Sequence, residues 1–225
     1  MNAISDPRDR SAGKPRPRSI CPRFAEHADR IVSGLTAHGH VVVDDFVTAD
    51  FVERLRTEAH ALRTTGAFRP AGVGRGASWR RDLGVRGDEV LWVDPARPTR
   101  EQAPLLMVMD ELRLALNQHL YLGLADYEAH LAVYPAGHAY VRHRDQHSDS
   151  DARVVTTSLY LNDDWSPGDG GRLRVFLETG QSLEVPPVGG VLVVFLSQDF
   201  EHEVLPARQE RTSWTGWMRR ERRGR

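Results

Sequence analysis

Apolar and polar positions follow a helical period in the first half of the chain. Apolar residues recur every three or four positions in three segments, which is typical of amphipathic helices that bury one face. Thr48 directly precedes the second segment and is a good N-cap. The predicted helices cover residues 24–37, 49–66 and 102–121, and short strands are predicted at residues 40–47 and 89–93.

From residue 127 onward the pattern changes to a period of two, in short β-rich runs broken by Gly, Pro, Asn and Asp. Several short strands in succession favour a jelly-roll or cupin-like barrel, in which a metal can lie at the mouth on side chains from opposite sheets. The sequence therefore predicts an α+β fold, with a double-stranded β-helix core braced by N-terminal helices. The predicted strands are residues 128–134, 140–144, 154–161, 172–177, 182–185, 191–196, 203–205 and 212–218.

The chain divides into one domain and two polar ends. Its 225 residues are enough for a single domain with a full core. Residues 1–22 combine prolines with Lys and Arg and hold few large apolar side chains, so we expect a flexible basic arm. Residues 23–220 form the predicted domain, and residues 221–225 form a basic tail that we interpret as a solvated end.

Composition narrows the partners and the compartment. The 30 basic and 31 acidic residues nearly cancel, so no overall field favours nucleic acid or an anionic membrane. No apolar stretch approaches the roughly 18 residues that span a bilayer, and the first residues lack the apolar core of a signal peptide. The single cysteine, Cys21, lies in the predicted arm and fits a reducing compartment. We expect a cytoplasmic protein, and the sequence leaves its oligomeric state open.

Three residues form a candidate metal site. His143 and Asp145 are two positions apart, so on a strand they project from one face. Residues 189–196 then form a Gly-Gly turn and an apolar strand that can return His202 to the first two. Two imidazoles and one carboxylate are the ligands of non-haem Fe(II) oxygenases. Arg211 follows nine residues later, and its planar, always charged guanidinium suits a carboxylate ligand. The alternatives are a solvated strand face and a surface ion pair.

Residues 67–87 are rich in glycine and contain Arg75, Arg80 and Arg81, so a loop is predicted there. Loops of this length inside a compact domain are more often functional than idle. His138 and His147 flank the ligand pair but lie in polar turns, and we interpret them as solvated. The remaining histidines, including His130, show no constellation.

Short motifs follow one another in order along residues 40–218, and together they resemble the prolyl hydroxylase domain enzymes. Enzymes of that family act on hypoxia-inducible factor in animals, and bacterial relatives act on elongation factor Tu. The motifs are Arg86-Gly87-Asp88-x-x-x-Trp92, Tyr134-Pro135, Tyr140-Val141-Arg142-His143-x-Asp145, Arg153-Val154-Val155-Thr156, Tyr160-Leu161-Asn162-x-x-Trp165, Gly170-Gly171-x-Leu173-Arg174, His202-Glu203-Val204-x-Pro206, Arg211 and Trp217.

The resemblance implies an iron- and 2-oxoglutarate-dependent dioxygenase. It makes His143, Asp145 and His202 the Fe(II) ligands and Arg211 the partner of the distal carboxylate of 2-oxoglutarate. Ascorbate is a candidate reductant. The residues that it places near the co-substrate are Tyr134, Tyr160 and Thr215.

The resemblance also implies a substrate side of the site. Arg153 and Trp217 are expected beside the target residue, with Asp88 paired to Arg153, and Tyr140 is a further expected substrate contact. The segment between Tyr134 and His143 is one residue shorter than in the animal enzymes, which leaves the orientation of Tyr140 open. Residues 67–87 correspond to a flap that closes over a peptide.

The implied reaction hydroxylates a prolyl residue, at its 4-position, in an exposed loop of a cytosolic protein such as elongation factor Tu, with release of succinate and CO2. Asp145 favours hydroxylation over halogenation, since halogenating relatives have a small residue there. Two alternatives remain open: a hydroxylase of a free amino acid or other small molecule on the same scaffold, and a cupin-like binding module without catalysis.

Overall fold

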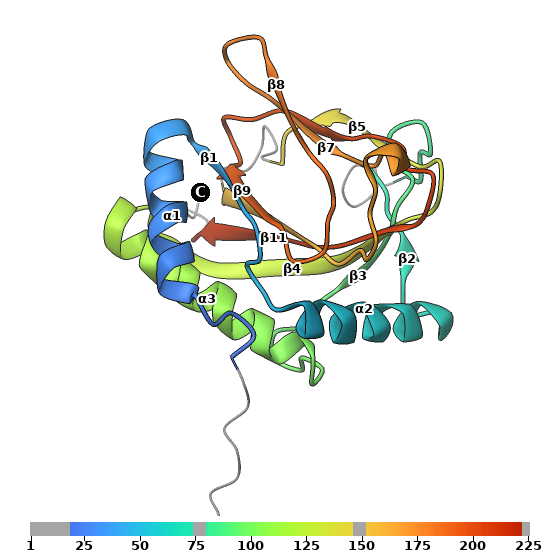
Figure 1. Ribbon diagram of the computed structural model, residues 1–225, viewed down its shortest axis with the longest axis horizontal. Helices are drawn as coiled ribbons and strands as arrows, with labels where there is room; N and C mark the ends of the chain where they lie inside the picture. Colours follow the sequence, from blue (N-terminus) through green and yellow to red (C-terminus); the bar gives the residue numbers. More distant parts are fainter. Residues whose placement is uncertain (1–18, 74–79, 146–151, 222–225) are drawn as a thin grey trace, which may run out of the picture.

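Two antiparallel sheets lie face to face, and helices cover the outer side of the larger sheet (Figure 1). The computed structural model describes residues 19–73, 80–145 and 152–221. Among these residues the helices are α1 (Phe24–His38), α2 (Ala49–Thr64) and α3 (Gln102–Leu120).

The larger sheet has seven strands in the order β1-β9-β6-β11-β4-β3-β2, and the smaller has four in the order β5-β10-β7-β8, within the described residues. This arrangement confirms the predicted double-stranded β-helix. The large sheet is built from β1 (His40–Val43), β2 (Arg69–Pro70), β3 (Glu89–Trp92), β4 (Leu124–Tyr134), β6 (Arg153–Tyr160), β9 (Leu192–Leu196) and β11 (Arg211–Arg220). The small sheet is built from β5 (Tyr140–His143), β7 (Leu173–Phe176), β8 (Ser182–Val185) and β10 (His202–Val204).

The helices begin and end close to where the apolar pattern places them. Thr48 is the N-cap of α2, and its Oγ1 accepts a hydrogen bond from the Phe51 N–H at 3.4 Å. Gly39 ends α1 in the left-handed region, at φ 70°. The predicted strand at residues 40–47 is too long, because β1 stops at Val43 and the chain then turns through Asp45 at φ 52°.

Alternation along the central strands divides the core into two layers. Leu131, Leu159 and Trp214 are fully buried on the helix side of the large sheet. Tyr160 and Phe195 lie on the opposite face, within the layer between the two sheets. Residues two apart on one strand share a face, so the sequence period decides which side chains reach the space between the sheets.

Two expectations about irregular segments need correction. Residues 67–87 are not loop throughout, because β2 pairs with β3, Val73 bridges to Arg80, and the Val85 carbonyl accepts the Val141 N–H at 2.9 Å. Arg75 lies outside the described residues. The arm is also shorter than predicted: Ile20 and Cys21 are buried, and the Ile20 carbonyl accepts the Thr48 N–H at 2.9 Å. The rest of the arm, His147 and residues 222–225 lie outside the described residues.

None of the described helices is long and apolar enough to cross a bilayer.

Candidate metal centre

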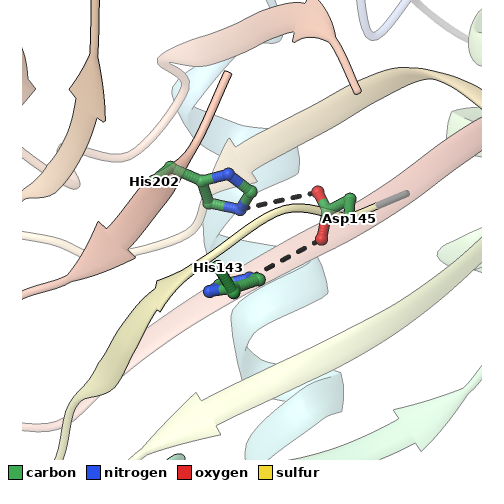
Figure 2. Close-up of side chains that lie close together, drawn as sticks. All are labelled: His143, Asp145 and His202. Atoms are coloured by element: carbon green, nitrogen blue, oxygen red, sulfur yellow. Dashed lines mark ion pairs between the residues drawn. The ribbon is translucent and has the colours of Figure 1, made fainter. Parts of the chain in front are cut away.

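His143 and His202 are direct cross-strand partners in the pairing of β5 with β10. Asp145 follows β5, and its two carboxylate oxygens face the two rings (Figure 2). His143 Nε2 lies 3.7 Å from Asp145 Oδ1, and His202 Nε2 lies 3.5 Å from Asp145 Oδ2. The three donor atoms lie within 4.8 Å of one another. Since imidazole nitrogens and carboxylate oxygens bind transition ions at about 2 Å, donors around one ion lie roughly 3 to 4 Å apart, which fits this trio.

Asp145 reaches this position differently from the prediction. It is not on the strand with His143, because β5 ends at His143 and Asp145 lies in the bend that follows. Its Oδ2 accepts a hydrogen bond from Thr156 Oγ1 on β6 at 2.9 Å, and Thr156 Oγ1 is also 2.9 Å from Ser197 Oγ. The carboxylate is therefore oriented by the large sheet while the two imidazoles belong to the small sheet.

Backbone carbonyls fix the tautomers of both rings. His143 Nδ1 lies 2.7 Å from the Val141 carbonyl oxygen, and His202 Nδ1 lies 3.4 Å from that of Phe200. A carbonyl only accepts, so each neutral ring donates from Nδ1 and leaves the lone pair of Nε2 directed at the site. The same two-residue spacing on both strands prepares both rings as ligands.

The electrostatics of the trio favour the form that binds a divalent ion. Burial lowers the pKa of His202 to about 4, so the ring is neutral at pH 7. Burial raises the pKa of Asp145, but its electrostatic interactions with His202 and His143 and its side-chain hydrogen bonds outweigh burial and hold that pKa well below its usual range. The neutral His202 imidazole beside the ionised Asp145 carboxylate matches the donor set that Fe(II) prefers.

Arg211 lies in the same cavity as the trio, a space of about 680 Å³ between the sheets. Its side chain is 2% exposed, and Nε donates to the Gly171 carbonyl at 3.0 Å. No carboxylate pairs with it in the part of the chain that the structure describes. A buried unpaired charge is costly, so this guanidinium requires an anionic ligand. The rings of Tyr134 and Tyr160 flank it at 5.2 and 5.0 Å.

Known proteins share both this arrangement and this sequence. A family model for the 2OG-Fe(II) oxygenase superfamily matches residues 129–219. A solved prolyl-4-hydroxylase from Pseudomonas putida is 44% identical with a TM-score of 0.80, over 86% of this chain and 99% of that one. This chain belongs to the 2OG-Fe(II) oxygenase superfamily, with prolyl hydroxylases among its relatives.

One further relative is similar in sequence, and one further structure shares the fold. Human Egl nine homolog 1 is 36% identical over 196 residues, which is 83% of this chain and 45% of that protein. The chain thus spans about half the length of this curated relative and of its mouse and rat counterparts. A prolyl hydroxylase from Trichoplax adhaerens shares the fold at 24% identity, with a TM-score of 0.80 over 89% of this chain and 92% of that one.

The remaining predicted site residues of the oxygenase are distributed unevenly around the cavity. Tyr134, Thr215, Arg153 and Trp217 line it. Tyr160 does not line it but is fully buried beside Arg211, and its hydroxyl interacts with the side chains of Ser158 and Arg211. Tyr160 therefore supports the guanidinium from outside the cavity.

The expected ion pair between Asp88 and Arg153 is not formed. Asp88 instead accepts two hydrogen bonds from Arg86, at 2.8 and 2.5 Å, and Arg153 pairs with Glu128 at 2.8 Å. Asp88 and Arg86 are two residues apart on extended backbone, so their side chains share a face and meet without any tertiary rearrangement.

Tyr140 is oriented by its neighbours rather than by the length of its loop. Its ring stacks on His143 with the centroids 3.6 Å apart, and Arg86 lies over its other face at 4.4 Å. Tyr140 therefore covers a metal ligand directly, and the Arg86–Asp88 pair fixes it from behind.

Trp92 and His130 are among the cavity residues that the sequence did not predict as part of the site. Both line the cavity beside Trp217. His130 lies on β4 four residues before Tyr134 and therefore on the same face, a signal that the period of two contains. The sequence does not show, however, that Trp92 and Trp217 lie beside His130, because the pairing of β3, β4 and β11 brings them together.

Proposed function

We propose that this oxygenase hydroxylates a prolyl residue, at its 4-position, in a cytosolic protein such as elongation factor Tu, and releases succinate and CO2. The observation that carries the proposal is the buried, unpaired Arg211 in the cavity that also holds His143, Asp145 and His202. A metal triad alone is compatible with a binding module. A triad with an anion-demanding guanidinium in one cavity is the site of an enzyme that uses a dicarboxylate co-substrate.

The residues of this chain have separable tasks in that reaction. His143, Asp145 and His202 would hold the ion beside the cavity that receives the co-substrate. Arg211 binds the distal carboxylate of 2-oxoglutarate, and Tyr134, whose ring centroid lies 5.2 Å from the Arg211 Cζ, borders the same part of the cavity. With Fe(II) and 2-oxoglutarate bound, the site gains the oxidising power to insert one atom of O2 into a C–H bond.

The substrate side consists of Arg153 and Trp217, which form the wall beside the trio. Arg153 Cζ lies 3.5 Å from the Trp217 ring, so the guanidinium covers one face of the indole. This wall orients the target carbon and, with the peptide in place, excludes water from the reacting atoms.

Relatives favour a prolyl substrate. The Pseudomonas putida protein is described as a prolyl-4-hydroxylase, and the Trichoplax adhaerens enzyme was solved with a peptide of hypoxia inducible factor. A free amino acid or another small molecule on the same scaffold is the competing substrate class.

The proposal is tested by reconstituting the protein anaerobically with Fe(II), 2-oxoglutarate and ascorbate. Proline-containing peptides of elongation factor Tu are then added with O2 and followed by mass spectrometry, while succinate is measured in parallel. The expected result is a gain of one oxygen on a single proline, with one succinate per oxidised peptide. Asp145→Ala is the control and should yield neither product.

Succinate without peptide oxidation would overturn the elongation factor assignment and favour another protein or a small molecule. The absence of succinate from the wild type would overturn the dioxygenase reaction itself.

A further inference from the structure

One helix of this molecule carries large apolar side chains on its exposed face. Met107 and Leu114 on α3 are 66% and 53% exposed, and Tyr121, which directly follows the helix, is 88% exposed. Each of the three is seven residues from the next, and seven residues make almost two full helical turns. Their side chains therefore lie in one line along the helix, and we call these three residues the α3 row.

The α3 row lies opposite the side by which the helix packs. That side is fully buried against the outer layer of the large sheet, through Leu105, Met109, Leu112 and Leu116. A helix that buries one side normally presents polar residues on the opposite one. Here the apolar row occupies that position, and it points away from the cavity, which lies on the other side of the large sheet (Figure 1).

The other two described helices do not share this property. Their exposed positions hold charged residues, such as Asp29 and Arg30 on α1 and Glu53 and Arg54 on α2. Single exposed apolar residues are normal on a protein surface, whereas three at a seven-residue spacing on one helix have the spacing of a helix–helix contact. The other exposed large apolar residues of the described chain lie apart from one another in the sequence: Leu83, Trp92, Val141 and Val188.

Tyr121 adds a cost that burial in a contact would offset. It ends α3 in the left-handed region, at φ 54°, where a residue other than glycine is strained by about 1 kcal/mol. The same residue also exposes its ring almost completely. A tyrosine ring combines apolar area with a hydroxyl, and this combination is frequent at interfaces between proteins.

The polar residues beside the α3 row favour a second copy of the same helix in one orientation. If two copies of α3 cross antiparallel at Leu114, Met107 of one chain lies against the partner's Tyr121. Glu111, which is exposed, then lies near the partner's Gln118, whose amide can donate to the carboxylate. In a parallel pair each Glu111 would instead face its own copy, and like charges at that distance destabilise a helix pair.

We propose that the α3 row is the contact of a homodimer, in which two α3 helices pack antiparallel around a two-fold axis at Leu114. A two-fold contact uses the same surface of both chains, and the α3 row is complementary to itself in this orientation. The helix has 19 residues and is about 28 Å long, so one helix pair covers less than the roughly 1,200–2,000 Å² of a standard interface. We therefore expect a weak dimer, with a dissociation constant of about 10–100 µM. Both cavities stay open, and the inference does not depend on the proposed function.

Sedimentation equilibrium of the full chain, from about 5 to about 300 µM, tests whether the dimer forms. The wild type should pass from monomer to dimer over this range. Leu114→Lys should remain monomeric, because two lysines would meet at the two-fold axis. Val188→Lys is the matched control, since it removes an exposed apolar side chain outside α3, and it should dimerise like the wild type.

Cysteine variants test the orientation of the two helices. Leu114→Cys should form a disulfide-linked dimer on mild oxidation, because the axis brings its two copies together. Met107→Cys alone should not, since its two copies lie about 21 Å apart along an antiparallel pair and a disulfide needs Cα atoms within about 7 Å. A mixture of Met107→Cys and Tyr121→Cys should link. The wild type should not link, because Cys21 is 2% exposed.

A wild type that stays monomeric over the whole range would overturn the inference. Dimerisation of Leu114→Lys at the wild-type concentration, or loss of the dimer in Val188→Lys, would also overturn it, because the contact would then lie elsewhere. Disulfide-linked dimers of Met107→Cys alone would contradict the antiparallel pairing on which the inference rests. The dioxygenase reaction is measured separately, by succinate formation, so the two proposals fail independently.

Discussion

Thr156 Oγ1 donates a hydrogen bond to Asp145 Oδ2 at 2.9 Å, so a residue of the large sheet holds the ligand that follows a strand of the small sheet. Both side chains are buried. This contact joins the two sheets at the metal centre. It also fixes the orientation of the Asp145 carboxylate, which lies in the bend after β5. Removing a group that orients a metal ligand in this way typically lowers the affinity for the metal by about 10- to 100-fold.

Thr156→Val is expected to weaken metal binding about tenfold, because the carboxylate loses its donor while the volume is kept. The dissociation constant for Mn(II), measured by calorimetry under argon, reports the change. Thr157→Val is the matched control: the neighbouring hydroxyl contacts Tyr127 and the Gly216 carbonyl on the other face of β6. Equal effects of the two substitutions on the Mn(II) constant would contradict this role of Thr156.

Arg211→Met should separate co-substrate binding from folding. It removes a buried charge without a carboxylate partner in the described residues, so the Tm of the ligand-free protein should not fall. The rise in Tm that 2-oxoglutarate and Mn(II) produce together should disappear, and the KM for 2-oxoglutarate should rise at least about 100-fold.

Arg174→Met is the control for removing an arginine, since Arg174 is partly exposed and pairs with Glu184 and Glu203 at 2.7 Å. It should keep the Tm response to 2-oxoglutarate. An Arg211→Met protein that still responds like the wild type would show that the anion binds elsewhere.

The period of the apolar pattern and the local motifs made much of this molecule predictable. The resemblance placed Tyr134 and Arg211 near the co-substrate, and both line the cavity; the segment between Gly190 and His202 returned the third ligand as expected. These positions could be predicted because they depend only on local motifs and on one strand that brings the chain back to the first two ligands. The fold class followed for the same reason.

Relations that depend on choosing among competing partners were not predictable. Asp88 had two arginines of equal charge within reach of the predicted fold, and it pairs with Arg86 rather than Arg153. Cys21 lies in a polar segment, yet it is 2% exposed because neighbouring residues pack against the helices. His130 looked like an isolated histidine until the pairing of β3, β4 and β11 placed it between two indoles.

Two of the buried histidines, His130 and His202, should make the ligand-free protein less stable as pH falls. Burial lowers the pKa of each to about 4, whereas the ordinary value is 6.5. Between these values the unfolded chain takes up protons that the folded chain does not, so the free energy of unfolding falls as pH drops from 6.5 to 4. At pH 5 each ring should remove about 2 kcal/mol relative to pH 7.5.

Urea unfolding at pH 7.5 and pH 5, in the presence of a chelator, measures this loss. His130→Met has no ring to titrate, so its stability should fall by about 2 kcal/mol less than that of the wild type between the two values. If the free energy of unfolding falls equally in both proteins, protonation of His130 does not contribute to the loss of stability.

Gly171 and Gly123 allow backbone strain to be separated from crowding at the co-substrate site. Both adopt a left-handed conformation, at φ 65° and φ 66°, so an alanine at either position is strained by about 1 kcal/mol. A Cβ at Gly171 would lie 2.8 Å from the Trp165 ring and 2.9 Å from the Ala207 Cβ, whereas nothing lies within 4 Å of one at Gly123. The Gly171 carbonyl also accepts the hydrogen bond from Arg211 Nε.

Gly171→Ala should therefore displace the backbone that positions Arg211 and raise the KM for 2-oxoglutarate about tenfold or more, in addition to lowering the Tm. Gly123→Ala should lower the Tm slightly and leave the KM unchanged, because its Cβ would displace no neighbouring atom and Gly123 does not line the cavity. If both variants shift the KM alike, backbone strain alone is the cause, and the close fit around Gly171 has no part in binding the co-substrate.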